Sequence, residues 1–135
     1  MAKRNFDEGY IPLPTQSSKI PIQLNFTGAL SYSVNGYYSI SGDTASIYIP
    51  AYNGYATASD FLRADLPINL TPLNSITIMG SVVRAAPSTL NEAVGLITIS
   101  NTGQIIISDD IANDPFVLGY FCGTYNGQTL TYNLN

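Results

Sequence analysis

The chain has 135 residues, of which 45% are hydrophobic and 10% are charged, and five basic against nine acidic side chains give a net charge of −4. This size suits one domain with a buried core, and the scattered cations argue against a nucleic-acid partner. One cysteine excludes an intrachain disulfide, and the absence of histidine excludes catalytic triads built on that residue.

Residues 1–19 are predicted to form an extended arm that precedes a head domain at residues 20–135. Pro12 and Pro14 oppose a helix and favour an extended path. The arm is either a disordered tail or a segment that docks on a partner or a neighbouring subunit, with Phe6, Tyr10, Ile11 and Leu13 as anchors. The sequence has neither the apolar run of a signal peptide nor one of transmembrane length, so we expect synthesis in a cytoplasm and no membrane insertion.

Residues 20–50 alternate between apolar and polar side chains, which predicts short strands. We expect strands near residues 20–28, 31–34, 37–40 and 45–49. Asn35-Gly36 and Ser41-Gly42-Asp43 are predicted turns. Residues 51–75 are less regular, with a predicted turn at Asn53-Gly54 and an edge strand favoured over a helical turn at residues 59–66.

The second half of the chain predicts a strand at residues 76–84, a loop at 85–92 and a β-hairpin at 95–108. Gly103 supplies the positive φ that a short hairpin loop requires. A loop at 109–115 and strands at 116–122 and 128–134 complete the chain. The hairpin is expected to place four isoleucines on one face: Ile97, Ile99, Ile105 and Ile107.

In total, about nine or ten short strands and no helical period predict an all-β, antiparallel β-sandwich. Ile106 departs from its alternation, because it is apolar on the face that should be polar. This predicts that a second subunit covers that face. The candidate residues for a subunit interface are Met79, Val83, Ile106 and Phe121.

Tyrosine is the second unusual feature, with ten residues in the chain. Tyrosine combines apolar area with a hydroxyl group, which suits subunit interfaces and sugar-binding surfaces. The alternative is that several tyrosines fill the rim of the sandwich. The candidate ligand or interface residues are Tyr48, Tyr52 and Tyr55.

Carboxylates provide the remaining chemistry. Asp109, Asp110 and Asp114 could offer oxygen ligands to Ca²⁺, although their spacing departs from an EF-hand loop and favours a solvated loop. Asp60, Asp65 and Glu92 could supply the carboxylate pair of a glycan hydrolase, although surface charge explains them better. We expect no cofactor and no enzymatic activity.

The order of these motifs resembles the C-terminal head domains of viral and phage fibres and of collagen-like surface proteins. The resemblance covers residues 28–134 and rests on strand and turn patterns at residues 38–50, 61–67, 76–83, 95–107 and 116–134. It implies a jelly-roll sandwich of the tumour-necrosis-factor and C1q type that forms homotrimers.

The resemblance also implies a function. It points to a non-enzymatic structural protein of the virion, either a fibre head or a capsid-decoration protein, which binds a host glycan or receptor. A monomeric carbohydrate-binding module is the alternative, followed by a carboxylate-dependent glycan hydrolase.

Overall fold

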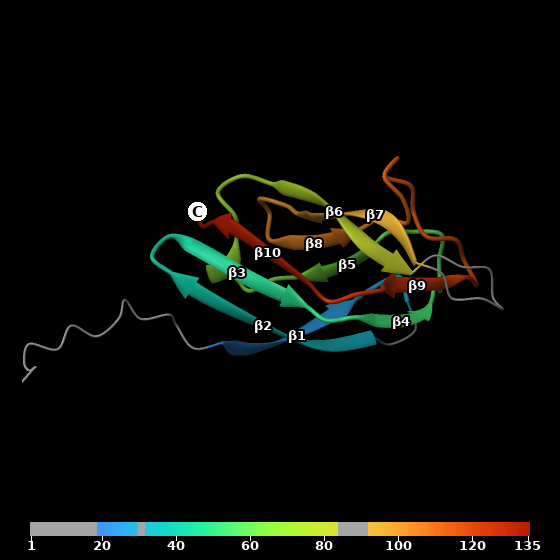
Figure 1. The fold of residues 1–135 in the computed structure, drawn as a ribbon, viewed down its shortest axis with the longest axis horizontal. Coiled ribbons are helices and arrows are strands. Elements are labelled where there is room, and N and C mark those ends of the chain that lie inside the picture. Colours follow the sequence, from blue (N-terminus) through green and yellow to red (C-terminus); the bar gives the residue numbers. More distant parts are fainter. Residues whose placement is uncertain (1–18, 30–31, 84–91) are drawn as a thin grey trace, which may run out of the picture.

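The computed structural model describes residues 19–29, 32–83 and 92–135. These residues form ten antiparallel strands and one short 3₁₀ helix (Figure 1), which confirms the predicted all-β sandwich. The predicted arm anchors Phe6, Tyr10, Ile11 and Leu13 lie outside the described residues. The strands are β1 (Ile20–Phe26), β2 (Tyr32–Ser41), β3 (Thr44–Ile49), β4 (Tyr52–Tyr55), β5 (Leu62–Asp65), β6 (Ile76–Val83), β7 (Glu92–Ile99), β8 (Gln104–Ile107), β9 (Phe121–Thr124) and β10 (Gln128–Asn133), and the 3₁₀ helix η1 spans Ile68–Leu70.

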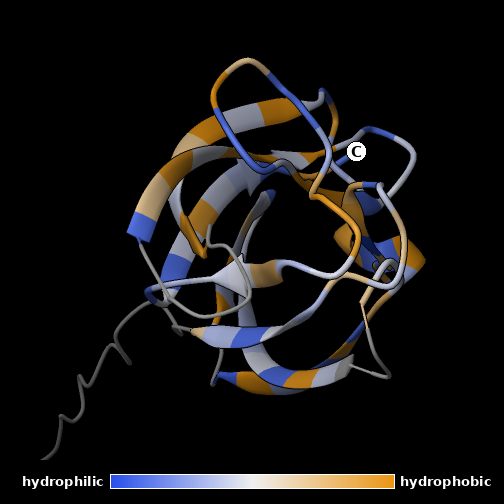
Figure 2. Ribbon diagram, turned by 90° about the vertical axis from the view of Figure 1, so that its right-hand side faces the viewer, coloured by the Kyte–Doolittle hydropathy of each residue, from blue (hydrophilic) through white to orange (hydrophobic). Residues whose placement is uncertain are grey.

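Two sheets form the layers of the sandwich. The four-stranded sheet has the order β1-β2-β3-β10, and the six-stranded sheet has the order β4-β9-β6-β7-β8-β5. Hydrophobic and hydrophilic residues alternate along the strands (Figure 2), so each sheet turns one face to the core. Fully buried side chains from both sheets fill that core, including Leu24, Ile47, Ile49, Leu62, Val82, Ile97, Ile99, Ile105, Ile107 and Leu130.

Bridges outside the named strands join the sheets. Thr27, which follows β1, pairs with Arg63 in the edge strand β5. Pro72 pairs with Leu134 after β10. The two sheets are therefore connected by backbone pairing as well as by the packing of their inner faces.

The β7–β8 hairpin agrees with the sequence prediction. All four isoleucines on its inner face, Ile97, Ile99, Ile105 and Ile107, are fully buried. Gly103 has φ 86°, and its N–H donates to the Ser100 carbonyl at 2.9 Å. This loop requires the left-handed conformation that glycine adopts readily.

The predicted turn at Asn35-Gly36 is wrong, because β2 continues through it. Gly36 pairs with Ile22 of β1, and a Cβ atom on Gly36 would collide with the Tyr48 carbonyl oxygen. The glycine therefore permits close approach of two backbones within a sheet. The turn predicted at Asn53-Gly54 is also wrong, since both residues lie inside β4.

The strand predicted at residues 116–122 begins only at Phe121. Phe116 is buried in the core from a loop, and the segment between it and β9 forms a turn. In the sequence, an apolar residue that packs into the core from a loop cannot be distinguished from the first residue of a strand. The predicted edge strand in residues 59–66 is confirmed as β5, which lies at the end of the six-stranded sheet.

Candidate functional site

A hollow of about 220 Å³ lies on the four-stranded sheet. Tyr37 on β2 and Tyr48 on β3 are register partners, and their side chains are 45% and 39% exposed. Two tyrosine side chains thus stand next to each other on this sheet. The hollow is lined by Lys19, Tyr37, Tyr38, Ser39, Ser46, Tyr48 and Thr129.

Strand alternation determines which side chains reach this surface. Tyr38, Ile47 and Leu130 pack against the core, so their neighbours in the three strands point outward. Ser39 is the partner of Ser46, and the hydroxyl of Ser46 lies 2.9 Å from that of Thr131 on β10. The surface around the two tyrosines is therefore a row of hydroxyl groups.

The position of the Tyr48 ring depends on Gly127. A Cβ atom at position 127 would collide with the Tyr48 hydroxyl group and ring. The glycine in the turn before β10 therefore leaves room for the tyrosine. Together the aromatic side chains offer apolar area to C–H groups, and the surrounding hydroxyls can donate and accept hydrogen bonds. Lys19 adds one positive charge at the edge.

The three tyrosines singled out from the sequence are not brought together. Tyr52 is only 8% exposed and stacks on Phe26 with ring centroids 5.3 Å apart, so its assignment to a binding surface is corrected to the core. Tyr55 is exposed but lies in the other sheet, where it stacks on Phe121 at 4.5 Å. Sequence reasoning did not single out Tyr37 as a candidate, although the predicted turn at Ser41-Gly42-Asp43 joins its strand to the strand of Tyr48.

The candidate interface residues belong to the six-stranded sheet. Met79 is 71% exposed, whereas Ile106 and Phe121 are half-buried. Val83 is 2% exposed and has almost no surface to offer a partner, so its assignment to an interface is corrected. Leu96, the register partner of Met79, is half-buried, and nearby Val94 is 54% exposed. Both were missed, although they share the outward alternation of β7.

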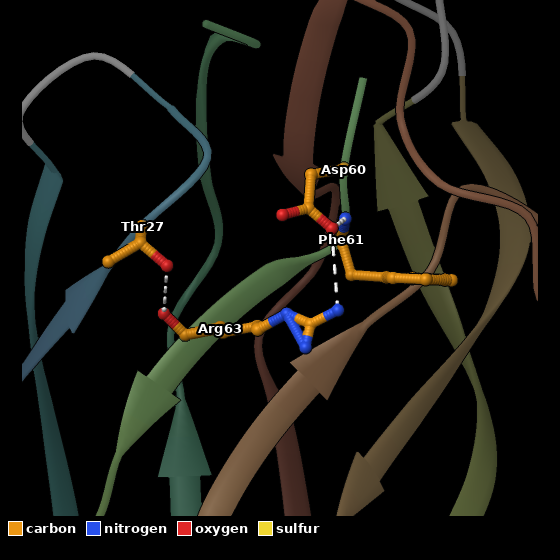
Figure 3. Close-up of polar contacts among 4 residues, drawn as sticks. All are labelled: Thr27, Asp60, Phe61 and Arg63. Atoms are coloured by element: carbon orange, nitrogen blue, oxygen red, sulfur yellow. Dashed lines mark hydrogen bonds and ion pairs between the residues drawn. The ribbon is translucent and has the colours of Figure 1, made fainter. Parts of the chain in front are cut away.

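The carboxylates of Asp60, Asp65 and Glu92 have separate partners. Figure 3 shows Asp60 accepting from the backbone N–H of Phe61 at 2.7 Å and pairing with Arg63 at 3.3 Å. Asp65 accepts from Gln104 on β8, whereas Glu92 accepts from Ser81 and Asn126. Each carboxylate is therefore engaged by its own neutral groups or by arginine.

Arg63 connects further elements through both its side chain and its main chain. Its guanidinium carbon lies 5.4 Å from the centroid of the Phe61 ring, and its carbonyl accepts from the Thr27 backbone N–H at 2.8 Å. Figure 3 shows Thr27 beside this carbonyl. Arg63 therefore fixes the start of β5 against the end of β1.

In the loop at residues 109–115, aspartates form hydrogen bonds with the backbone of the same loop. One oxygen of Asp110 accepts from the N–H groups of Ala112 and Asp114 at 3.0 and 3.1 Å. Asp109 is buried, and its N–H donates to the Asp114 carbonyl. Within residues 19–29, 32–83 and 92–135, no group of three or more His, Cys, Asp and Glu residues is placed to hold a metal ion.

Two further findings bear on the environment of the chain. Cys122 is fully buried, and burial, with a smaller contribution from the charge of Asp109, raises the pKa of its thiol to about 12. The described ranges contain no helix whose length and hydropathy would let it span a bilayer.

Comparison with known proteins supports the fold. No protein-family model matches the chain, and neither does any curated protein. Among solved structures, the chain is similar to a reovirus attachment protein, sigma1, crystallised in complex with alpha-2,3-sialyllactose. The TM-score is 0.59 at 12% sequence identity, and the match covers 87% of this chain and 65% of the solved chain. The likeness confirms that the fold resembles that of a viral attachment protein, and the chain spans just under two thirds of the solved one.

Proposed function

We propose that the chain is the non-enzymatic head of a viral attachment protein and that it binds a host-surface glycan in the Tyr37–Tyr48 hollow. The observation that carries the proposal is the pair of exposed tyrosines in register on β2 and β3, set among serine and threonine hydroxyls. The likeness in fold to a viral attachment protein supports the viral role.

The hollow suits a sugar better than a charged or purely apolar ligand. A tyrosine ring packs against the C–H face of a pyranose, while hydroxyls of Ser39, Ser46 and Thr129 meet its polar edge. Among the described residues that line the hollow, Lys19 is the one cation, so the proposed site does not depend on strong charge pairing. The open position on a sheet surface also leaves room for the rest of an oligosaccharide.

We further propose that three copies assemble through the outward face of the six-stranded sheet. Met79, Leu96 and Val94 bring large apolar side chains to neighbouring positions on β6 and β7, and Ile106 extends the apolar face onto β8. Exposed apolar patches of this kind mark interaction surfaces. A virion location and contacts of the arm with capsid proteins complete the proposal.

A glycan array probed with the full-length chain tests the binding role. We expect selective binding to host-type oligosaccharides, and Tyr37→Ala and Tyr48→Ala should each weaken it at least about tenfold, because each ring supplies much of the contact area. Tyr125→Ala is the matched control, since Tyr125 is 43% exposed and does not line the hollow. Absence of glycan binding by the folded chain contradicts the proposed role.

A monomeric carbohydrate-binding module is the second candidate, because β2, β3 and β10, which carry the two tyrosines and the hydroxyls, lie side by side in a single sheet. Light scattering separates the two candidates. A trimer at micromolar concentration supports the attachment head, whereas a monomer that still binds glycans supports the module.

A further inference from the structure

The strand β6 lies inside the six-stranded sheet but is paired along only part of one edge. On one side β7 pairs with it from Ile76 to Val83, whereas on the other side β9 pairs with it only where Val82 faces Thr124. Figure 1 shows the chain leaving β9 and turning into β10, which belongs to the other sheet. In the part of the sheet that the structure describes, the half of β6 that precedes Ser81 therefore has an open edge.

Strand alternation shows which backbone groups face this open edge. The Ser81 N–H donates to Oε1 of Gln128 at 3.1 Å, and the Ser81 carbonyl accepts from the Tyr125 N–H at 3.1 Å. The backbone groups of Ser81 thus point away from β7, and those of Met79 and Thr77 point the same way. Among the described residues, none donates to or accepts from these groups of Met79 and Thr77. They are available to pair with an added strand.

The side chains at the open edge do not protect it. Met79 is 71% exposed and Thr77 is also exposed, and neither is a charged residue or a proline, which commonly guard such an edge. The edge strand β5 is better covered, because Thr27 pairs with Arg63 there. A hollow of about 680 Å³ next to Met79 and Gln128 leaves room for a further segment.

The 18 residues before Lys19 contain a segment whose pattern fits the open edge. Pro12 and Pro14 have no N–H and stand at alternate positions, so in a strand both face one edge, which must point away from a partner strand. We call this the proline edge. Ile11 and Leu13 direct their backbone groups to the opposite edge, where they can pair.

The side chains of this segment also complement the open edge. In an antiparallel pair, residues that exchange hydrogen bonds lie opposite each other and on the same face. Ile11 and Leu13 would therefore stand beside Thr77 and Met79 on the outward face of the six-stranded sheet. They would cover the exposed Met79 side chain with apolar groups.

We infer that residues 11–15 of one copy pair as an antiparallel strand with the open edge of β6 in a second copy. Eighteen extended residues span about 60 Å at most, which suffices to reach a neighbour. An arm that returned to its own β6 would cross either β2, β3 and β10 or β5, β8 and β7. It would then cover the glycan hollow or the apolar face around Met79, so the choice of a second copy rests on the proposed function.

Disulfide trapping between full-length variants tests the pairing. One set of variants carries Ile11→Cys, Leu13→Cys or Thr15→Cys, which together cover neighbouring registers, and its partner carries Thr77→Cys. Each pair is co-expressed with two different tags, so that mixed assemblies form, and is then oxidised. We expect a covalent dimer that carries both tags from at least one pair, because opposed residues in an antiparallel pair lie within disulfide distance.

A matched control replaces Thr77→Cys by Val117→Cys. Val117 is 47% exposed and lies in the connection between β8 and β9, away from β6. The yield of mixed dimer should be at least about tenfold lower with this control. Cys122 does not compete, because it is fully buried and burial raises the pKa of its thiol to about 12.

Amide hydrogen exchange of the full chain, measured by NMR, gives a second readout. The N–H groups of Thr77 and Met79 should exchange at least about tenfold more slowly in the unchanged chain than in Thr15→Pro, because that variant removes a donor from the pairing edge. Gln16→Pro is the matched control. Position 16 falls on the proline edge, so this variant should retain the slow exchange.

The outcomes separate this inference from the proposed function. Thr15→Pro should bind glycans as the unchanged chain does, so loss of strand pairing is distinct from failure of the glycan role. Absence of a mixed dimer above the Val117→Cys control, or equal exchange in Thr15→Pro and Gln16→Pro, overturns the inference even where light scattering shows a trimer. Cross-linking only within a single chain that carries both cysteines assigns the arm to its own β6 and overturns it too.

Discussion

The hydroxyl of Tyr132 donates a 2.8 Å hydrogen bond to the main-chain carbonyl of Leu70, and both residues are buried. The bond ties the last strand, β10, to the 3₁₀ helix that precedes β6. Tyr132→Phe keeps the ring but removes the hydroxyl donor, so the buried carbonyl of Leu70 loses this hydrogen bond. We expect a loss of about 1–3 kcal/mol in the free energy of unfolding, measured by urea denaturation. The exposed control Tyr125→Phe should change stability by less than about 0.5 kcal/mol.

Stability should fall at alkaline pH. Burial raises the pKa of Tyr132 from 10.0 to about 12, and burial followed by the charge of Asp109 raises that of Cys122 from 9.0 to about 12. Above pH 9 the unfolded chain releases these protons while the folded chain retains them, so unfolding becomes more favourable. The stabilisation is complete below pH 9 and is lost as pH rises toward 12.

Urea denaturation at several values between pH 8 and 11 measures this effect. The double variant Cys122→Ala with Tyr132→Phe removes both groups, and its stability should decline less steeply with pH than that of the unchanged chain. Equal slopes for the two proteins would contradict the assignment.

Gly36→Ala should destabilise the four-stranded sheet strongly. The added Cβ would collide with the Tyr48 carbonyl oxygen, and neither β2 nor β3 can shift without disturbing its other partner. We expect a loss of more than about 2 kcal/mol in thermal or urea unfolding. Gly42→Ala is the matched comparison, because it has open space and only a positive φ of 59° to oppose the change. It should cost about 1 kcal/mol, and a loss in Gly36→Ala no larger than this would contradict the expected collision.

Ile106→Asp tests the proposed trimer. The carboxylate would replace a half-buried apolar side chain between Arg63 and Thr98 on the outward face of the sheet. Because burying a charge in an interface is costly, we expect folded monomers or insoluble protein in place of trimers, measured by light scattering. Leu73→Asp changes a 52% exposed residue outside this sheet and should leave the mass unchanged. If Ile106→Asp still forms a trimer, Ile106 does not lie in the interface.

Much of the fold follows from alternation of side chains along the sequence. In the strand predicted near residues 45–49, the alternate residues Ala45, Ile47 and Ile49 are all fully buried in β3. The hairpin isoleucines were predicted for the same reason. Asn35-Gly36 misled the prediction because a glycine needed for close approach of two backbones carries the same local signal as a glycine in a turn.

The candidate site was less predictable. Its lining residues come from β2, β3 and β10 and from Lys19, and only strand register brings them together. Composition signalled the importance of tyrosine but did not distinguish exposed Tyr48 from buried Tyr52. That distinction depends on the Phe26 ring, which belongs to the opposite sheet and stacks on Tyr52.

The buried thiol of Cys122 also bears on the covalent structure of the chain in different redox environments. The sequence has one cysteine, and its raised pKa keeps the thiol protonated at neutral pH, whereas exchange with glutathione requires an accessible thiolate. The covalent structure is therefore the same in the reducing interior of a cell and in the oxidising medium outside it. The fold therefore needs no oxidation step in either environment.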